Sequence, residues 1–402
     1  MAIATRIFLS TSSLLVVRSL GVAARALGLL TLAAGMPPER FAHYAVALVL
    51  SELARCATDF GLDPVLLRRA EGLEDAEQRP MIRSAMAVRA VHGVLAAAVV
   101  IAIIAVSFPL DILLVAAGLQ FLSQGMLQLG LNWRQVNNSA HRAAPLLIVF
   151  YGAVIAVAVA AYFRPALGAV ALPAMLGGEL LMAFGLLVSL GRPRISDLRS
   201  GYSLLVPQAL PMAGIMLLAF VNTRTDALLV GRLIAPAEAG HYLYLARWVD
   251  LAPMLATGVA LPLVGKLGKF DLRRGAPLLC ALGAALAIVP FMLVQFAAHL
   301  NPAYGSDLVL RTLLATTAAC RIGLAVTTTT LLAQWRDRTL ARLAVVTTVM
   351  LPVLAWAMGS SFGAYGVAAG VLIAEAGNLS FQAALLLGRS FPATLRPRRK
   401  PR

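Results

Sequence analysis

Charged residues are scarce in this chain of 402 residues, of which Asp, Glu, Lys and Arg together make up 13%. A soluble globular protein carries about 25% charged residues, so a soluble domain of ordinary composition is excluded. Cysteine is rarer still, and Cys56, Cys280 and Cys320 lie inside apolar stretches without disulfide or metal-ligand spacing. Walker, nucleophile-elbow, dinucleotide-binding and metal-triad patterns are missing as well. We therefore expect neither an enzyme nor a bound cofactor or metal.

Apolar residues make up 60% of the chain and fall in continuous blocks close to the ~20 residues that a helix needs to cross a bilayer. A β-barrel would show weak alternation instead. The sequence therefore predicts an all-α polytopic membrane protein with about twelve transmembrane helices. We place the spans near residues 8–34, 41–66, 88–108, 112–131, 145–163, 167–190, 203–231, 240–264, 277–299, 308–333, 343–359 and 365–388.

Basic residues lie mainly in alternate loops, and this bias sets the orientation because cytoplasmic loops are enriched in Lys and Arg. One side holds clusters within 68–89, 134–142, 192–199, 266–274, 336–342 and 389–402, whereas the other side holds Arg40, Arg164 and Arg232. We expect a multi-pass protein with both termini in the cytoplasm. The same clusters account for most of the net charge of +16, which indicates topology and contact with anionic membrane lipids rather than nucleic acid.

The chain partly repeats itself at an offset of 198 residues. Pro38, His43 and Tyr44 match Pro236, His241 and Tyr242, and Glu52 matches Asp250. Because each repeat would hold six helices, the two halves share one orientation in the membrane. We therefore predict two parallel six-helix bundles, residues 1–200 and 201–402, facing each other across a central cleft, the second ending in a basic cytoplasmic tail.

One stretch, Pro37 to Arg69, is apolar enough to span the membrane yet carries charges in its interior. Its charges Glu52, Arg55, Asp59 and Asp63 share one helical face, at steps of three, four and four residues. A charge at mid-bilayer costs roughly 2.5–3.5 kcal/mol, so this face must meet protein or a wet cavity. Further charges within spans are Arg18, Arg25, Arg224, Arg247, Arg311 and Arg321, with Glu179, Asp226, Asp250 and Glu375.

These intramembrane charges have two interpretations. They form ion pairs that clamp helices together, for instance Arg55 with Glu52 or Asp59 and Arg247 with Asp250, or they contact a ligand. Guanidinium groups match phosphate oxygens, so the candidate substrate-binding residues are Arg18, Arg25, Arg55, Arg224, Arg247 and Arg321. The candidate coupling or salt-bridge residues are Glu52, Asp59, Asp226, Asp250 and Glu375. The nearly charge-free spans, among them 88–108, 112–131 and 145–163, are expected to face lipid.

Four segments resemble the polysaccharide flippases of the multidrug/oligosaccharidyl-lipid/polysaccharide exporter (MOP) superfamily. They are RSLGVAARALGLL from Arg18, GMPPERFAHYAVALVLSELARCATDFGLDPVLLRR from Gly35, NTRTDALLVGRLIAPAEAGHYLYLARWVDLAPML from Asn222, and FGAYGVAAGVLIAEAGN from Phe362. The resemblance covers nearly the whole chain but contains no short diagnostic motif.

The resemblance implies a transporter that works by alternating access. Its cargo would be an undecaprenyl-diphosphate-linked oligosaccharide, such as an O-antigen, capsule or exopolysaccharide repeat unit, for lipopolysaccharide or other surface polysaccharide biosynthesis. It also implies a bacterial inner membrane, a coupling cation or proton, and other polysaccharide-assembly proteins as candidate partners. A cation-coupled multidrug exporter of the same superfamily is the alternative, and a membrane polysaccharide polymerase or ligase is a third, which the short outer loops disfavour.

Overall fold

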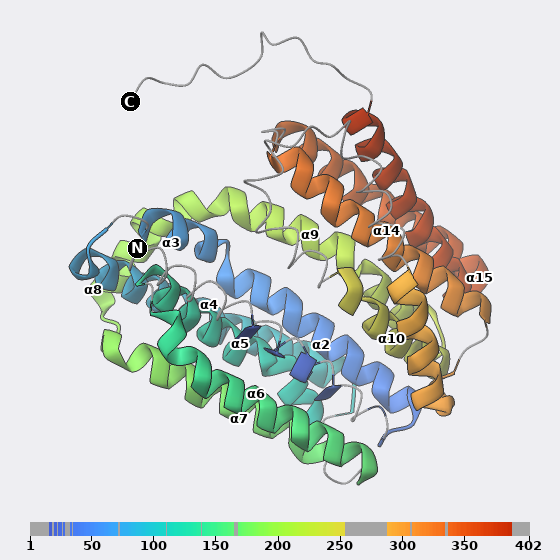
Figure 1. Ribbon diagram of the computed structural model, residues 1–402, viewed down its shortest axis with the longest axis horizontal. Helices are drawn as coiled ribbons and strands as arrows, with labels where there is room; N and C mark the ends of the chain where they lie inside the picture. Colours follow the sequence, from blue (N-terminus) through green and yellow to red (C-terminus); the bar gives the residue numbers. More distant parts are fainter. Residues whose placement is uncertain are drawn as a thin grey trace.

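A computed structural model shows that the secondary structure of the described chain is entirely helical (Figure 1). The residues it describes are 16–17, 20–21, 23–25, 27–28, 33, 35–70, 73–109, 111–137, 139–164, 168–253, 288–305, 308–333 and 337–387. In Figure 1, α2 runs through the middle, with α6 and α7 on one side and α14 and α15 on the other. The prediction of an all-helical membrane fold is confirmed.

The helices of the first half follow one another with short connections. They are α2 (Pro38–Asp59), α3 (Leu62–Ala70), α4 (Asp75–Ser107), α5 (Ile112–Val136), α6 (Ala140–Phe163) and α7 (Gly168–Leu187). Proline at the first position starts α2, where its missing N–H is not needed. The side chain of Asp111 caps α5 by accepting a hydrogen bond of 2.9 Å from the Leu113 amide.

The prediction of one charged helix from Pro37 to Arg69 is wrong, because the helix breaks after Asp59. Phe60 (φ 47) and Gly61 (φ 70) both adopt left-handed backbone conformations, and α3 starts at Leu62. A Cβ at Gly61 would lie 2.7 Å from the Ala209 carbonyl oxygen, so glycine also permits close contact with α9. Asp59 therefore ends α2, whereas Asp63 belongs to a separate helix, α3.

The charge-free segment 112–131 does not simply face lipid. It forms most of α5, which packs against α2, α4 and α7. Half of its most apolar window is buried, compared with 17% for α4 and 22% for α6. The expectation of a lipid-facing scaffold therefore suits α4 and α6 and is wrong for α5, which is a core helix of the first half.

The first half ends with the short helix α8 (Ile195–Ser200), and a π-helical turn, Gly201–Leu205, leads directly into α9. The longer helices are α9 (Val206–Leu233), α10 (Pro236–Val249), an apolar helix Ile288–Leu300, α14 (Leu308–Ala333) and α15 (Asp337–Leu387). Proline again starts α10, 198 residues after the start of α2, as the repeat predicts.

Helix α15 is a hairpin of two antiparallel arms joined at Gly363, whose φ of 59° and ψ of −139° reverse the chain. A Cβ on Gly366 would lie 2.0 Å from the Met358 carbonyl oxygen, and one on Gly370 would lie 2.7 Å from that of Leu354. The two arms therefore pack backbone to backbone. They correspond to the expected spans 343–359 and 365–388.

Six of the described helical segments are long and apolar enough to cross a membrane. They are Ala76–Ser107, Ile112–Gln135, His141–Ala161, Ile195–Leu233, Leu308–Thr328 and Thr339–Leu386, the last of which contains both arms of α15. Pro173–Leu187 and Ile288–Leu300 are shorter apolar helices. The total of about twelve spans stays a prediction, because residues 254–287 lie outside the described part.

Helix α2 joins the two halves, because it packs against α9 and α10 as well as α4 and α5. A Cβ on Gly240 of α10 would lie 2.1 Å from the Pro38 carbonyl oxygen, so the starts of α2 and α10 touch. Beside this contact, Phe41, Tyr244 and Tyr304 form a buried aromatic cluster, and Tyr304 donates a hydrogen bond of 2.9 Å to the Met36 carbonyl.

We predict that Gly240→Ala lowers the thermal stability of the purified protein, because the added methyl group must push α10 away from α2. Overpacking of this kind costs typically 1–3 kcal/mol. Gly214→Ala is the matched control, since a Cβ there meets nothing within 4 Å and alanine favours the helix of α9. Size-exclusion chromatography after heating in detergent measures both variants. Equal stability of the two would contradict the close contact.

Candidate functional site

Arg224 of α9 lies at the centre of a network of charged side chains that crosses from the first half to the second. Its Nε donates to Glu52 of α2 and its Nη1 donates to Asp250, which follows α10. The Nη2 of Arg224 also lies 3.3 Å from Glu52 Oε1. Glu52 and Asp250 are the two carboxylates that the 198-residue repeat matches, so one guanidinium joins equivalent positions of both halves.

Two further arginines extend this network. Arg247 of α10 donates through Nη1 to Glu52 Oε1 at 3.0 Å. Arg321 of α14 donates through Nη1 to Asp250 Oδ1 at 2.9 Å and through Nε to Glu375 Oε1 of α15 at 3.0 Å. The network therefore ties α2, α9, α10, α14 and α15 together in the interior of the protein.

Asp226 closes the network on the side of the second half. Its Oδ2 lies 3.9 Å from Arg321 Nη2 and accepts a hydrogen bond of 3.2 Å from the Tyr242 hydroxyl. Its Oδ1 accepts one of 2.8 Å from the Ala227 amide. Asp226 and Glu375 are both buried, and they lie against different nitrogen atoms of the Arg321 guanidinium.

The network is open at one end. The Glu52 side chain is 29% exposed, whereas those of Arg224, Arg247 and Arg321 are 11–14% exposed. Arg55, one turn further along α2, is exposed and forms no ion pair with a described residue. Arg247 Nη2 and Arg321 Nη2 are buried donors without a hydrogen-bond acceptor among the described residues. A ligand that offers several oxygens could therefore compete with the carboxylates at this open end.

A second cluster lies inside the first half around Glu179 of α7, whose side chain is fully buried. Arg25 donates to Glu179 Oε1 through Nε at 3.2 Å and Nη2 at 2.9 Å. Ser123 of α5 donates to Oε2 at 2.8 Å, and Tyr151 of α6 lies 3.4 Å from Oε1. Four polar groups thus surround one carboxylate, which fixes the segment around Arg25 against α5, α6 and α7.

A third cluster forms at the break between α2 and α3, and sequence reasoning missed its central residue. Arg89 donates to both Asp59 and Asp63 and, at 3.0 Å, to the Gly125 carbonyl oxygen. The basic residues up to Arg89 are expected in a cytoplasmic loop, but α4 already starts at Asp75 and the Arg89 side chain is only 1% exposed. Its position inside a helix that continues into an apolar run was the signal available.

The ion pairs in the structure differ from those predicted between residues that are close in sequence. Arg247 binds Glu52 instead of Asp250, and Asp59 binds Arg89 instead of Arg55. Arg25 and Arg224, which lack partners on their own helices, have carboxylate partners elsewhere in the chain. Arg18 lies outside the described residues.

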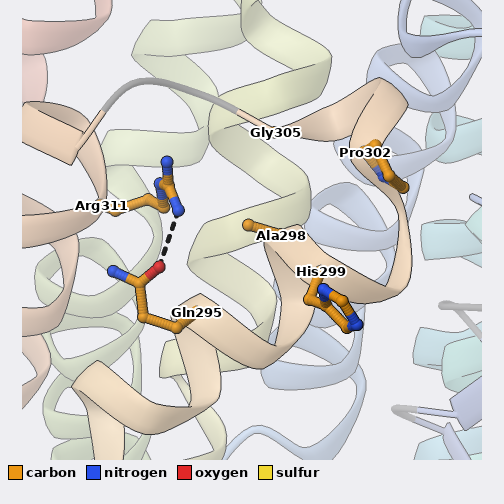
Figure 2. Close-up of a pocket in the computed structure, with 6 residues that line it drawn as sticks. All are labelled: Gln295, Ala298, His299, Pro302, Gly305 and Arg311. Atoms are coloured by element: carbon orange, nitrogen blue, oxygen red, sulfur yellow. Dashed lines mark hydrogen bonds between the residues drawn. The ribbon is translucent and has the colours of Figure 1, made fainter.

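A surface pocket of about 530 Å³ lies apart from these clusters, between the helix Ile288–Leu300 and α14 (Figure 2). It is lined by Gln295, Ala298, His299, Pro302, Gly305 and Arg311, and Arg311 donates to Gln295 at 2.7 Å across it. None of the network residues lines this pocket. The described residues contain no group of three or more His, Cys, Asp or Glu side chains that could hold a metal ion.

Comparison with known proteins gives a family match and a shared fold. The sequence model of the family described as "Polysaccharide biosynthesis protein" matches residues 32–260, more than half of the chain. No curated protein matches the chain in sequence. Among solved structures, the chain is similar to the lipid II flippase MurJ in an inward closed conformation, with a TM-score of 0.65 and 14% identity over 94% of this chain and 88% of that one.

Two multidrug transporter structures are also similar. An inward-facing multidrug resistance MATE family transporter of the MOP superfamily gives a TM-score of 0.58 at 13% identity, covering 91% of this chain and 95% of that one. A MATE in complex with MaL6 gives 0.56 at 11% identity, covering 95% and 96%. At these identities the likeness shows the fold, which all three structures share with this chain.

We predict that Arg25→Ala destabilises the protein more than the double variant Arg25→Ala/Glu179→Gln. Removing only the arginine leaves a buried, uncompensated carboxylate, which costs about 3 kcal/mol or more. Glutamine removes the charge and keeps one acceptor oxygen for Ser123 or Tyr151, while its amide nitrogen can donate to the other hydroxyl oxygen. Thermal stability in detergent measures the three proteins, and a double variant no more stable than the single one would contradict a buried ion pair.

Arg40→Ala is the control for this measurement, because Arg40 and Asp111 form a pair of 2.6 Å at an exposed position. Burial acts to raise the pKa of Asp111, but the hydrogen bond and charge of Arg40 hold that pKa below its ordinary value. Exposed pairs contribute about 0–1 kcal/mol. The Arg40 variant should therefore unfold close to the wild-type temperature.

Proposed function

Because the chain belongs to the polysaccharide biosynthesis protein family, we propose that it flips a polyprenyl-diphosphate-linked oligosaccharide across the cytoplasmic membrane by alternating access. The observation that carries this proposal is the network around Arg224, read together with the family match and the fold shared with a lipid II flippase. An arginine-rich network inside an all-helical membrane protein is the chemistry that a lipid-linked diphosphate requires.

The proposed transporter consists of two six-helix lobes, residues 1–200 and 201–402, around a central cleft. The matched carboxylates Glu52 and Asp250, both bound to Arg224, support a pseudo-two-fold axis that passes close to this guanidinium. Helices related by such an axis can change their mutual tilt while both keep hold of one central group. The network would then act as the pivot between inward- and outward-open states.

Exchange of partners explains how a diphosphate would bind to arginines that already have carboxylate partners. Phosphate oxygens entering at the exposed end would displace Glu52 from Arg224 and Arg247. Arg55 would add its guanidinium to the three of the network. The Nη2 groups of Arg247 and Arg321, which have no hydrogen-bond acceptor among the described residues, offer further hydrogen bonds. Bidentate binding by guanidinium groups favours a diphosphate over a neutral sugar. The oligosaccharide attached to the diphosphate would occupy the cleft, while the polyprenyl chain stays in lipid.

The basic loops support a bacterial inner membrane orientation with both termini in the cytoplasm. Cargo would then be loaded from the cytoplasmic leaflet, where lipid-linked repeat units are assembled, and released on the outer side. The proteins that build and polymerise these units are the expected partners in the pathway. The energy source would be a cation or proton held by carboxylates of the clusters.

We predict that Arg224→Ala abolishes surface polysaccharide in a strain that lacks the native gene, while Arg232→Ala supports normal amounts. Arg232 is exposed at the end of α9 and forms no ion pair with a described residue, so it controls for loss of one positive charge. Arg224→Lys keeps the charge but loses the planar fork and should give an intermediate result. Surface polysaccharide, lipid-linked units and protein level are measured in the same cells.

Two results would count against this proposal at different levels. Normal surface polysaccharide in the deletion strain would reject the flippase itself. Normal polysaccharide in Arg224→Ala cells would reject the role of the network. Accumulation of single lipid-linked units in the deletion strain is the expected result, whereas polymers of altered length without such accumulation would indicate a polymerase or ligase.

A cation-coupled multidrug exporter is the second candidate, because two MATE structures share the fold. A site for cationic drugs should have excess negative charge. Here Glu52, Asp226, Asp250 and Glu375 are balanced by Arg224, Arg247, Arg321 and the nearby Arg55. We therefore predict that deletion leaves susceptibility to cationic drugs unchanged, and a reproducible fall in inhibitory concentrations would favour the exporter.

A further inference from the structure

The cluster at the break between α2 and α3 has a charge that its own residues do not balance. Asp59 and Asp63 both direct Oδ1 at one guanidinium nitrogen, Nη2 of Arg89. The Nδ2 of Asn132 on α5 donates to the same oxygen of Asp63, and Gln128 donates to Asn132 at 2.9 Å. With both carboxylates ionised, two negative charges face a single positive one.

Most of this cluster is buried. Arg89 is 1% exposed, Asp59 is 7% exposed and Asn132 is fully buried, while the Asp63 side chain is 21% exposed. The remaining donors, an amide and a guanidinium, cannot change their charge. An uncompensated charge on the buried Asp59 would cost several kcal/mol, so a buried carboxyl group tends to take up a proton instead. Two carboxylates that share one donor also repel each other, which favours one shared proton.

No other described side chain neutralises the excess charge. Arg55, one turn before Asp59 on α2, is exposed and makes no ion pair with it. On α4, His92 packs against Phe60 and Tyr202 with ring centroids 5.6 and 5.7 Å apart. Arg134 on α5 forms no ion pair with either carboxylate, and α9 meets Gly61 through Ala209, Met212 and Ala213, which carry no charge.

We propose that Asp59 and Asp63 form a proton-binding site, in which one proton is shared between the two carboxyl groups and Arg89 neutralises the remaining charge. The proton enters and leaves as H⁺ without any other chemical step. This proposal stands on the charge and burial of the cluster and does not rest on the proposed function. It separates Asp59 from the network of Glu52 and Arg224, which has its own partners.

The location of the site gives the proton a mechanical role. Asp59 ends α2, Asp63 belongs to α3, and the left-handed residues Phe60 and Gly61 between them press on α9. Loss of the proton would leave two like charges on either side of this break and loosen α3 from α4 and α9. The protonated site therefore fastens the inner end of α2 to the helix that carries Arg224.

The test uses the purified full-length protein and four variants of this cluster, and measures thermal stability between about pH 5 and pH 9. The folded wild-type chain holds a proton that unfolded aspartates, with an ordinary pKa of about 3.9, have already released. Its folding equilibrium constant should therefore fall with rising pH, by up to about tenfold per pH unit, until the folded protein also releases the proton.

Asp59→Asn and Asp63→Asn each leave one carboxylate and one guanidinium. Both single variants should lose this pH dependence and match or exceed the wild-type stability at alkaline pH. The double variant leaves the buried Arg89 without a carboxylate, and Arg89→Gln leaves two carboxylates without a cation. Both should be strongly destabilised at every pH, while Asp111→Asn at the exposed pair with Arg40 should behave like the wild type.

Several outcomes would overturn the proposal. A wild-type stability that stays constant or rises with pH, with both single variants less stable, would show an ordinary ionised cluster. Stabilisation of the wild type by sodium over choline, lost in the single variants, would show a monovalent cation instead. If the variants do not fold, the infrared spectrum of the wild type decides, since the site requires a protonated-carboxyl band near neutral pH that disappears as pH rises.

Discussion

The structure depends on the two-sided hold of Arg224 on Glu52 and Asp250. A guanidinium inside a membrane protein is stable only where its charge is matched, and here the matching carboxylates come from α2 and from the end of α10. Arg247 adds a second ion pair between α10 and α2, and Arg321 of α14 extends the network to Glu375 of α15. The two halves of the chain are therefore joined by charge at their centre, in addition to the apolar contacts of α2 with α9 and α10.

The charged groups divide into separate clusters with different tasks. The Glu179 cluster has three polar side chains, with four donor atoms, around one carboxylate and is closed, which suits a structural clamp within the first half. The Arg224 network is open at Glu52 and retains unpaired donors, which suits ligand exchange. The Arg89 cluster is mostly buried, with excess negative charge beside a helix break, which suits a site that responds to protons. Closure, exposure and net charge distinguish these roles where residue type alone does not.

The sequence was sufficient for the helical membrane fold and for the interior location of most of the charges, because apolar length and the cost of a lipid-exposed charge are local properties. Its repeat also matched Pro38 to Pro236, the residues at which α2 and α10 start. It was not sufficient for the pairing. Arg25 and Glu179 are 154 residues apart and Arg224 and Glu52 are 172 apart, so only the packing of helices brings them together. The left-handed Phe60 has no sequence signal of its own, and this residue turned one predicted charged face into two.

Gly240 makes the contact between the two halves asymmetric. The offset of 198 residues matches Gly240 to Ala42, so a perfectly symmetric pair of halves would place the same residue on both sides of the axis. The observed contact is one-sided, since Gly240 meets the Pro38 carbonyl while Ala42 keeps its methyl group in the core. An alanine in place of Gly240 would put a methyl group against the Pro38 carbonyl, so the two halves are not interchangeable at this contact.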